Sequence, residues 1–225
     1  FNVSDLWPES AKSMGIVKNR LILALAEALE LSYYRRAALV TGTSDETVSS
    51  VRRRSSTAAE VITNGVDIDR FGPGYADDEA RTLLGTHDRV TFIYAGVMGL
   101  AQGLDLILDV AAAVRDLTHV QFALVGDGAE RESLTHRIQV ENLSNVRLLR
   151  AQPKERIPAL LAVSDVMFSV LKFAIPGAVP SKIYEAMASN LPILFAGEGE
   201  GARRVLDARA GQVLQYGDIR GLEEA

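Results

Sequence analysis

The chain of 225 residues is 48% apolar and 24% charged, so it can bury a large core within one or two domains. Its formal net charge of −5 argues against a nucleic-acid-binding protein, because neutralising phosphates requires a basic surface. The absence of cysteine excludes disulfides and thiol chemistry, and His87, His119 and His136 have no metal-ligand spacing. There is no visible signal peptide and no apolar run of ~20 residues. Since the chain begins at Phe1 rather than Met, we expect a fragment of a longer cytoplasmic protein.

The first residues, Phe1 to Glu9, predict the end of a strand followed by a loop. Residues 18–37 predict a helix, because Leu21, Ile22, Leu25, Ala28 and Leu29 recur at helical spacing. That apolar face suits a membrane, a lipid acceptor or the rest of its own domain. We expect it to pack on its own domain, since the segment lacks a dense Lys/Arg face.

Strands are predicted at residues 38–42 and 60–62, on either side of a helix that begins near Ser44 and ends at the arginines of residues 52–54. The Gly/Pro/Asp-rich stretch that begins at Asn64-Gly65 and runs to Asp78 is the best domain boundary in the chain. Asp67 and Asp69 have the spacing of a paired metal site, but no third ligand is near, so we expect no metal there.

Beyond this boundary strands and helices alternate, which predicts an α/β fold with a doubly wound parallel sheet. The predicted strands are 90–95, 120–125, 145–149, 166–170, 192–197 and 212–214. Candidate ligand-binding residues follow the first three strands: Gly96, Gly99 and Gly103, then Gly126 and Asp127, then Arg150. The glycines do not match the dinucleotide-binding spacing, but they allow backbone N–H groups to approach a diphosphate at the next helix. The alternative is that each glycine serves only its turn.

The stretch from Val179 to Leu194 predicts a loop, a short helix, a turn and a buried strand. Lys182 and Glu185 are three residues apart, so they share one helix face and can reach one ligand together. A cation on phosphate and a carboxylate on ribose hydroxyls would suit a nucleotide; the alternative is a surface ion pair. We expect Asn190 to take the left-handed position after the helix. The neighbouring binding candidates are Pro180 at the helix start, Ser181 as a capping hydroxyl, and Tyr184.

An ordered set of motifs resembles the family-4 glycosyltransferases, which are retaining GT-B-fold enzymes that use nucleotide-sugars. The set covers nearly the whole chain: Asn64-Gly65-Val66-Asp67, the glycine-rich turn, Val125-Gly126-Asp127-Gly128, residues 152–158 and residues 179–194. Asp5-Leu6-Trp7-Pro8-Glu9, residues 99–104 and residues 180–185 further resemble the bacterial surface-polysaccharide subgroup, including enzymes similar to N-acetyl-fucosaminyl transferases.

The resemblance implies a GT-B-like architecture with three parts. Residues 1–70 would be a remnant of the acceptor-side domain, 71–88 a linker, and 89–225 a Rossmann-type donor domain truncated at its end. Glu185 matches the second glutamate of the family's E-x7-E pattern, but the first would fall at Gly177. The family's two diphosphate-binding cations would fall at Val97 and Gln102, which leaves Lys182 as the substitute.

We therefore expect hexosyltransferase-type sugar transfer from a nucleoside-diphosphate-sugar to a lipid-linked or polysaccharide acceptor, with retention and without metal or other cofactor. Lys182 and the backbone of residues 99–103 would stabilise the leaving diphosphate, and the base would lie near Arg150. The resemblance leaves a peripheral contact with the inner membrane face open and predicts no nucleic-acid partner. The alternatives are a non-catalytic nucleotide-binding module and a GT-B-fold sugar-nucleotide epimerase. Lacking half of the acceptor domain, the isolated chain should bind nucleotide without turnover.

Overall fold

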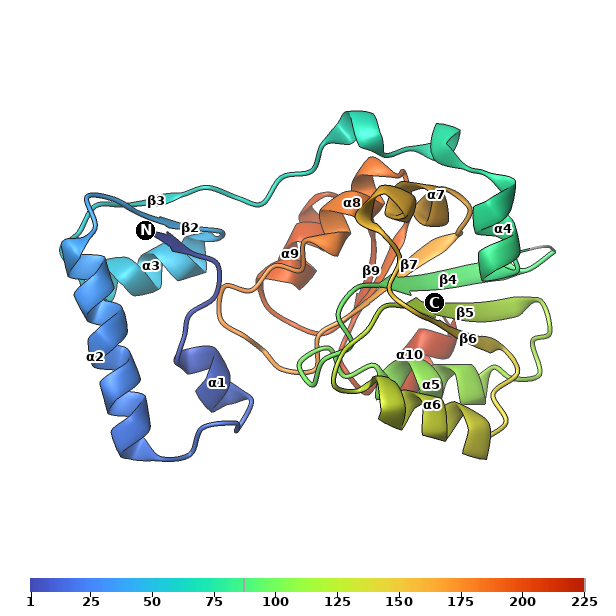
Figure 1. Cartoon of the computed structure of the whole chain (residues 1–225), viewed down its shortest axis with the longest axis horizontal. Helices are drawn as coiled ribbons and strands as arrows, with labels where there is room; N and C mark the ends of the chain where they lie inside the picture. The colour runs from blue at the N-terminus through green and yellow to red at the C-terminus, as the bar shows by residue number, and fades with distance from the viewer. Residues whose placement is uncertain (87, 225) are drawn as a thin grey trace. The chain divides into compact units, whose positions relative to one another are not determined.

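The computed structural model describes residues 1–86 and 88–224 (Figure 1). His87 and Ala225, which belong to the predicted linker and donor domain, lie outside the described residues. By their internal contacts the residues form two compact units, and each is described by itself. The first comprises Phe1–Gly65, Phe173–Pro180 and Glu198–Arg203, and the second comprises Val66–Lys172, Ser181–Gly197 and Arg204–Ala225.

The first unit contains a parallel three-stranded sheet in the order β1-β2-β3. Its strands are β1 (Asn2–Val3), β2 (Val40–Gly42) and β3 (Ala59–Val61), and its helices are α1 (Glu9–Ser13), α2 (Arg20–Arg36) and α3 (Asp45–Arg54). Two helices begin as their sequence predicts, because the side chains of Asn19 and Ser44 accept backbone N–H groups of α2 and α3. The core of the unit gathers around Tyr34, which is fully buried.

The apolar face of α2 corrects one prediction. We expected it to pack on its own domain, yet Leu21, Leu25 and Leu29 are 76%, 72% and 56% exposed, and Ile22 is also exposed. The face that does pack carries Tyr34, together with the partly buried Leu31. Spacing alone could not choose between these two faces, since both are apolar.

The end of the range predicted as acceptor-side remnant and the predicted linker, residues 71–88, contain secondary structure. Two short 3-10 turns, η1 (Ile68–Arg70) and η2 (Pro73–Tyr75), precede the helix α4 (Asp78–Leu84). The Asp77 carboxylate caps α4 by accepting the N–H of Ala80 at 2.7 Å, and Gly85 ends the helix with a φ of 66°. These cap residues were a helix signal that our composition-based interpretation of the stretch missed.

The second unit is built on a six-stranded, wholly parallel sheet in the order β6-β5-β4-β7-β8-β9. Its strands are β4 (Val90–Ala95), β5 (Val120–Val125), β6 (Val146–Leu149), β7 (Val166–Val170), β8 (Ile193–Ala196) and β9 (Gly211–Leu214). Each lies within one or two residues of its predicted range, because continuous apolar runs bounded by turns are typical of strands buried on both faces.

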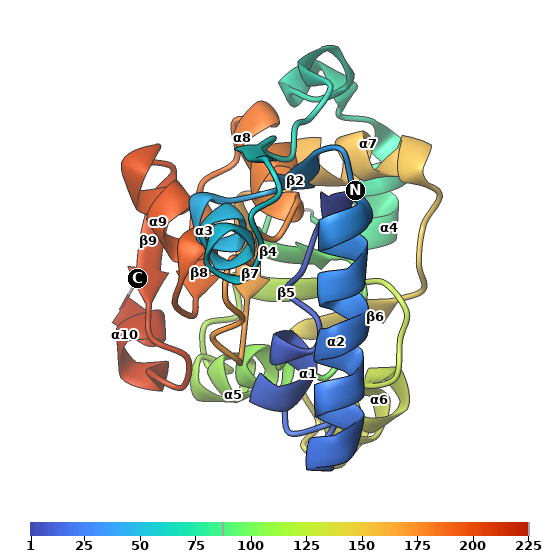
Figure 2. The ribbon, with the colours of Figure 1, turned by 90° about the vertical axis from the view of Figure 1, so that its left-hand side faces the viewer.

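Helices cover both faces of this sheet. The remaining helices are α5 (Asp105–Ala113), α6 (Arg131–Val140), α7 (Ile157–Ala162), α8 (Lys182–Ala188), α9 (Glu200–Asp207) and α10 (Ile219–Glu224), with the 3-10 turn η3 (Lys154–Arg156) before α7. On one face lie α5, α6 and α10, and on the other α4, α7 and α8 (Figure 1, Figure 2). The α5–α6–α10 side holds a large cluster that includes Phe122, Phe168 and Leu222. This is the predicted doubly wound α/β architecture; of the helices that cover the sheet, α4 and α10 were not predicted.

Candidate functional site

The strand order places β4 beside β7, although β5 and β6 lie between them in the sequence. The chain leaves β4 toward one face of the sheet and leaves β7 toward the other (Figure 2). In parallel α/β sheets the crevice outside such a reversal, at the carboxyl ends of the strands, is where ligands bind. The segments that follow β4 and β7 are the glycine-rich loop of residues 96–104 and the stretch that leads into α8. The residues predicted from the sequence at these two segments therefore lie at this edge of the sheet.

Close backbone contacts hold the glycine-rich loop against the turn after β5. A Cβ added at Gly126 would lie 1.9 Å from the carbonyl oxygen of Gly96, so the two chain segments meet where only glycine fits. Met98 extends this contact, because its N–H donates to the Asp127 carbonyl at 2.8 Å and its carbonyl accepts from Glu130 at 2.9 Å. A Cβ at Gly128 would lie 2.4 Å from that Met98 carbonyl. The loops after β4 and β5 thus form one rigid backbone platform.

The same loop presents unpaired backbone donors at the start of α5. Within the described residues, the N–H groups of Leu100, Ala101 and Gly103 have no hydrogen-bond acceptor. Successive free N–H groups at a helix N-terminus form a concave anion site. Gly99 differs from our prediction, because its N–H is already bonded to the Gln102 Oε1 at 3.1 Å. The N–H groups of Leu100, Ala101 and Gly103 therefore stay candidates, and that of Gly99 does not.

Lys182 is the first residue of α8, and its ammonium group lies 3.8 Å from the ring centroid of Tyr94, at the end of β4. A Cβ placed on Gly96 would be 3.0 Å from the Lys182 Nζ, so the cation also borders the glycine-rich loop. The side chain is partly buried and has no ion pair or hydrogen bond within the described part of the chain. Burial lowers the pKa of Lys182 to about 7, against the opposing effect of the nearby Glu185 carboxylate.

Tyr94, which was not among our candidates, places the face of its ring against the Lys182 ammonium group. Its hydroxyl donates to the Val97 carbonyl at 2.6 Å, which ties the ring to the glycine-rich loop, and the ring itself is fully buried. A cation over an aromatic face is stabilised by the ring quadrupole. Nothing in the sequence joins positions 94 and 182, so only the fold could reveal this pair.

Glu185 lies one turn along α8 from Lys182 and is partly buried. Burial raises the pKa of the Glu185 carboxyl, while Lys154 and Lys182 oppose that rise. Lys154, in η3 after β6, is thus a second cation near Glu185 that sequence reasoning did not select. The surface ion-pair alternative is not what the structure contains, because Lys182 and Glu185 form no ion pair within 4.0 Å.

The start of α8 differs in detail from the prediction. Ser181 takes the N-cap position but has helical dihedral angles (φ −58°, ψ −28°), and its hydroxyl makes no capping bond, so it is exposed and available. Pro180 lies just before the cap rather than in the first helical turn and packs with the first unit. Tyr184 is partly buried on α8. Asn190 has a φ of 58° and ends the helix as predicted.

The remaining candidates lie further along the edge of the sheet. Asp127 and Arg150 are exposed at the ends of β5 and β6, one and two strands from β4, and Arg150 makes its contact through its carbonyl, which accepts from Gln152 at 3.1 Å. Lys172 follows β7, and its N–H donates to the Ala101 carbonyl at 3.0 Å. Its ammonium group lies 6.0 Å from the Tyr216 ring. Lys182 and Lys172 therefore flank the two sides of the glycine-rich loop.

The surroundings of Gly177 leave no room for the glutamate that the family pattern has at this position. It belongs to the first unit, where its N–H donates to the Glu46 carboxylate at 2.8 Å and its carbonyl accepts from Ser44 at 3.0 Å. Its φ is 72°, and an added Cβ would lie 2.2 Å from the Thr47 Oγ1. Both the backbone and the space therefore exclude a larger residue.

A parallel, doubly wound sheet with glycine-rich turns at its reversal places the chain among the α/β proteins of that class. Comparison with known proteins identifies the family. Residues 89–225 match the family described as glycosyl transferases group 1, which is more than half of the chain. The chain belongs to that family.

Two relatives give the level of similarity. The protein WcaI of Escherichia coli (strain K12), named as a colanic acid biosynthesis glycosyl transferase, is 30% identical over 197 residues, which are 83% of this chain and 48% of WcaI. The GDP-mannose-dependent alpha-(1-6)-phosphatidylinositol monomannoside mannosyltransferase of Mycolicibacterium smegmatis is 27% identical over 186 residues, which are 76% of this chain and 46% of that protein. The chain spans about half the length of these relatives.

Solved structures show the fold. HepE of Anabaena, in complex with UDP and glucose, superposes with a TM-score of 0.79 at 20% identity, over 100% of this chain and 59% of HepE. WaaG, a glycosyltransferase involved in lipopolysaccharide biosynthesis, superposes with a TM-score of 0.79 at 16% identity, over 99% of this chain and 63% of WaaG. The chain has the GT-B-like α/β fold of these glycosyltransferases. In the described residues no helix is long and apolar enough to cross a membrane.

Proposed function

We propose that the second unit binds a nucleoside-diphosphate-sugar at the β4/β7 reversal and forms the donor half of a retaining glycosyltransferase. The observation that carries this proposal is the position of Lys182 and Glu185 on one turn of α8, beside the free N–H groups of the glycine-rich loop. Keeping a partly buried cation without a paired carboxylate is unfavourable, which supports a site for an anionic ligand.

Each residue then has a distinct role. The donor diphosphate would lie between the Lys182 ammonium and the N–H groups of Leu100, Ala101 and Gly103, where negative charge grows as the sugar leaves. Glu185 would accept hydrogen bonds from the ribose hydroxyls, and the base would extend along the sheet edge toward Arg150. Because Lys182 and backbone donors meet the diphosphate charge, no metal ion is needed.

The acceptor we propose is a glycolipid or polysaccharide intermediate. WcaI and WaaG are named for colanic acid and lipopolysaccharide biosynthesis, which supports this class of acceptor. The relatives do not agree on the donor base, since one is GDP-mannose-dependent and HepE binds UDP. We propose that the intact protein acts in the cytoplasm, with residues 1–70 belonging to the acceptor side, 71–88 to the linker and 89–225 to the donor side.

A thermal-shift panel of UDP-, GDP- and dTDP-sugars, each with and without EDTA, tests the proposal. Stabilisation by one base class, retained in EDTA and reduced in Lys182→Ala, is the expected result. Binding that is lost with the chelator would contradict the metal-free site. Turnover of a nucleotide-sugar without acceptor would favour an epimerase, and nucleotide binding by an intact protein that transfers no sugar would favour a non-catalytic module.

A further inference from the structure

The amine of Lys182 has surroundings that set it apart from a surface lysine. Its Nζ lies 3.8 Å from the Tyr94 ring centroid, and a Cβ added at Gly96 would lie 3.0 Å from it, so the ring and the loop backbone shield part of the amine from water. Within the described residues it has no hydrogen-bond acceptor, and neither Glu185 nor any other carboxylate lies within 4.0 Å of it. A shielded amine without a partner gives up its proton more readily than a hydrated one.

Much of this amine is therefore uncharged near neutral pH. Burial lowers the pKa of Lys182 to about 7, against the opposing effect of the Glu185 carboxylate. Tyr94, the titratable group whose ring contacts the amine, stays neutral because burial raises the pKa of its hydroxyl. At pH 8 the nucleophilic free amine is then the main form of Lys182, whereas it makes up less than about 1% of a lysine with the usual pKa of about 10.4.

The reagent that suits this amine carries both an anion and an activated carbonyl carbon. The glycine-rich loop borders the amine at Gly96 and has free N–H groups at Leu100, Ala101 and Gly103 within the described part of the chain. Such donors bind phosphate. An acyl phosphate joins a phosphate directly to its acyl carbon, so holding the phosphate at the loop brings that carbon toward the amine.

We propose that Lys182 is a modification site, at which an acyl phosphate transfers its acyl group to the Nζ atom. The free amine attacks the acyl carbon and a C–N bond forms. The C–O bond to the phosphate breaks, inorganic phosphate leaves with the electron pair, and the surplus proton passes to solvent. Because the product amide carries no charge, the modification removes the cation from the donor site. This regulatory role rests on the proposed function of Lys182 in binding the donor diphosphate.

Incubation of the folded chain with acetyl phosphate at pH 8, followed by mass spectrometry of its peptides, gives the rate of acetylation at each lysine. The free-amine fraction favours Lys182 over an exposed lysine by about 200-fold at this pH. Its lower basicity and partial burial reduce that advantage, so we expect Lys182 to react at least about tenfold faster than Lys12 and Lys18.

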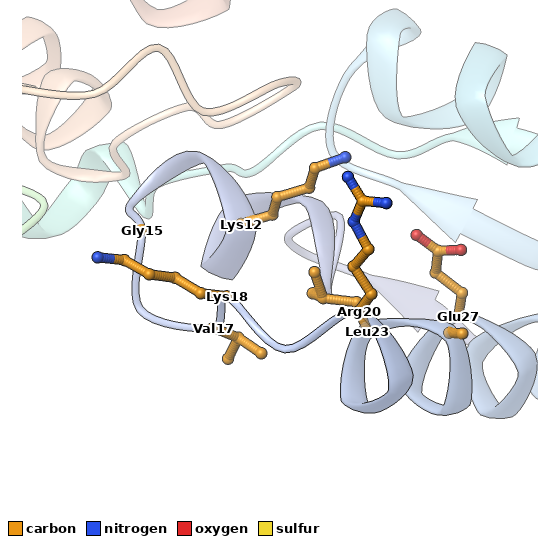
Figure 3. Close-up of a pocket in the computed structure, with 8 residues that line it drawn as sticks. Lys12, Gly15, Val17, Lys18, Arg20, Leu23 and Glu27 are labelled. Atoms are coloured by element: carbon orange, nitrogen blue, oxygen red, sulfur yellow. The ribbon is translucent and has the colours of Figure 1, made fainter.

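Lys12 and Lys18 are the internal controls, since both are exposed. The charged end of Lys12 faces that of Arg20, and Lys18 extends from the other side of the turn between α1 and α2 (Figure 3). A reagent that is attracted by positive charge alone would therefore label Lys12. Equal rates at Lys12 and Lys182, or a preference for Lys182 that persists when the chain is unfolded in urea, would overturn the proposal.

A second reagent separates the reactivity of the amine from the hold on the phosphate. The uncharged ester p-nitrophenyl acetate should also prefer Lys182 over Lys12, but by a smaller factor, and inorganic phosphate should slow only the reaction of Lys182 with acetyl phosphate. A preference for Lys182 with the ester that is absent with acetyl phosphate would overturn the acyl phosphate as the reagent.

Nucleotide-sugar binding measured on the same samples tests the regulatory role and separates it from the donor site. Acetylation should weaken binding as much as Lys182→Gln does, and treatment should not alter the affinity of Lys182→Arg, because a guanidinium group is not acylated. Selective acetylation that leaves the affinity unchanged would overturn the regulatory role. If Lys182 is acetylated selectively and the untreated chain binds no nucleotide-sugar, the proposed function fails while the modification site stands. If nucleotide-sugars bind and Lys182 reacts no faster than Lys12, this inference fails alone.

Discussion

Raising the pH from 6 to 8 should weaken nucleotide-sugar binding, because it removes the proton that Lys182 needs. Burial lowers the pKa of this ammonium to about 7, and no described carboxylate is within ion-pair distance of it. A diphosphate placed beside Lys182 favours the charged form and therefore raises its pKa. Binding must then take up a proton wherever the free protein has already lost it.

The magnitude follows from that pKa. Below pH 7 most molecules carry the charged lysine and affinity is nearly constant. Above pH 7 the charged fraction falls about tenfold per pH unit, which costs about 1.4 kcal/mol of binding free energy per unit. Between pH 6 and pH 8 we expect the affinity to fall about tenfold.

Calorimetry with UDP-glucose or the corresponding GDP-sugar measures this directly. The diphosphate of a nucleotide-sugar is esterified at both ends, so its own charge does not change in this range. Repeating the titration at pH 8 in two buffers of different ionisation enthalpy should reveal uptake of nearly one proton. The nucleoside alone should bind independently of pH.

The stability of the free protein should change in the opposite direction. The folded pKa of Lys182 lies below its unfolded value of about 10.4, so the unfolded state binds more protons between about pH 7 and pH 10. In this window the contribution of Lys182 to the free energy of unfolding rises with pH, by at most about 1.4 kcal/mol per unit. Lys182→Met should abolish both slopes. Affinity that stays constant from pH 6 to 8.5, or proton uptake that persists in Lys182→Met, would refute this reasoning.

Three further outcomes are expected. Lys182→Ala should weaken a nucleoside diphosphate far more than the nucleoside in parallel titrations; equal losses would assign the phosphate to Lys172 instead. Glu185→Gln should cost about 1.5–3 kcal/mol of nucleoside-diphosphate binding, through the lost charge-assisted bonds to ribose; an unchanged affinity would mean that the carboxylate does not touch the nucleotide. Gly126→Ala should lower the free energy of unfolding by about 2–3 kcal/mol in urea titrations, because its Cβ would meet the Gly96 carbonyl at 1.9 Å. Gly74→Ala is the control and should be neutral, since a Cβ there has no atom within 4 Å. Equal effects of the two substitutions would show that the loops after β4 and β5 move apart to make room for the added Cβ.

The sheet of the second unit was predictable because its determinants are local. Residues 90–95, 120–125 and 166–170 are apolar runs bounded by turns, and β4, β5 and β7 occupy those residues. The relation of Lys182 to Glu185 was also predictable, since a spacing of three fixes their shared face once the helix exists. Asn190 is a similar case, because few other residues accept a positive φ.

What the sequence could not show depends on contacts between distant positions. The ring of Tyr94 beneath Lys182 and the approach of Lys154 to Glu185 join three different strand ends. The Gly99 N–H is bonded to the Gln102 side chain, which competes with a ligand for that donor. The spacing of residues in the sequence does not reveal this bond. On α2 two apolar faces coexist, and hydrophobic spacing cannot tell which of them the fold covers.

The glycine platform has a consequence for how this loop can change. Its path is held by main-chain contacts of Gly96, Met98 and Gly126 and by the Tyr94 hydroxyl on the Val97 carbonyl, while the side chain of Val97 is 67% exposed. Position 97 is therefore open to substitution without a cost in folding, so an arginine, the residue that the family resemblance places there, can be introduced as Val97→Arg. In this loop the main chain determines the conformation, and the exposed side chains determine the charge beside the donor. The number of cations around the donor can therefore be changed by single substitutions without altering the backbone.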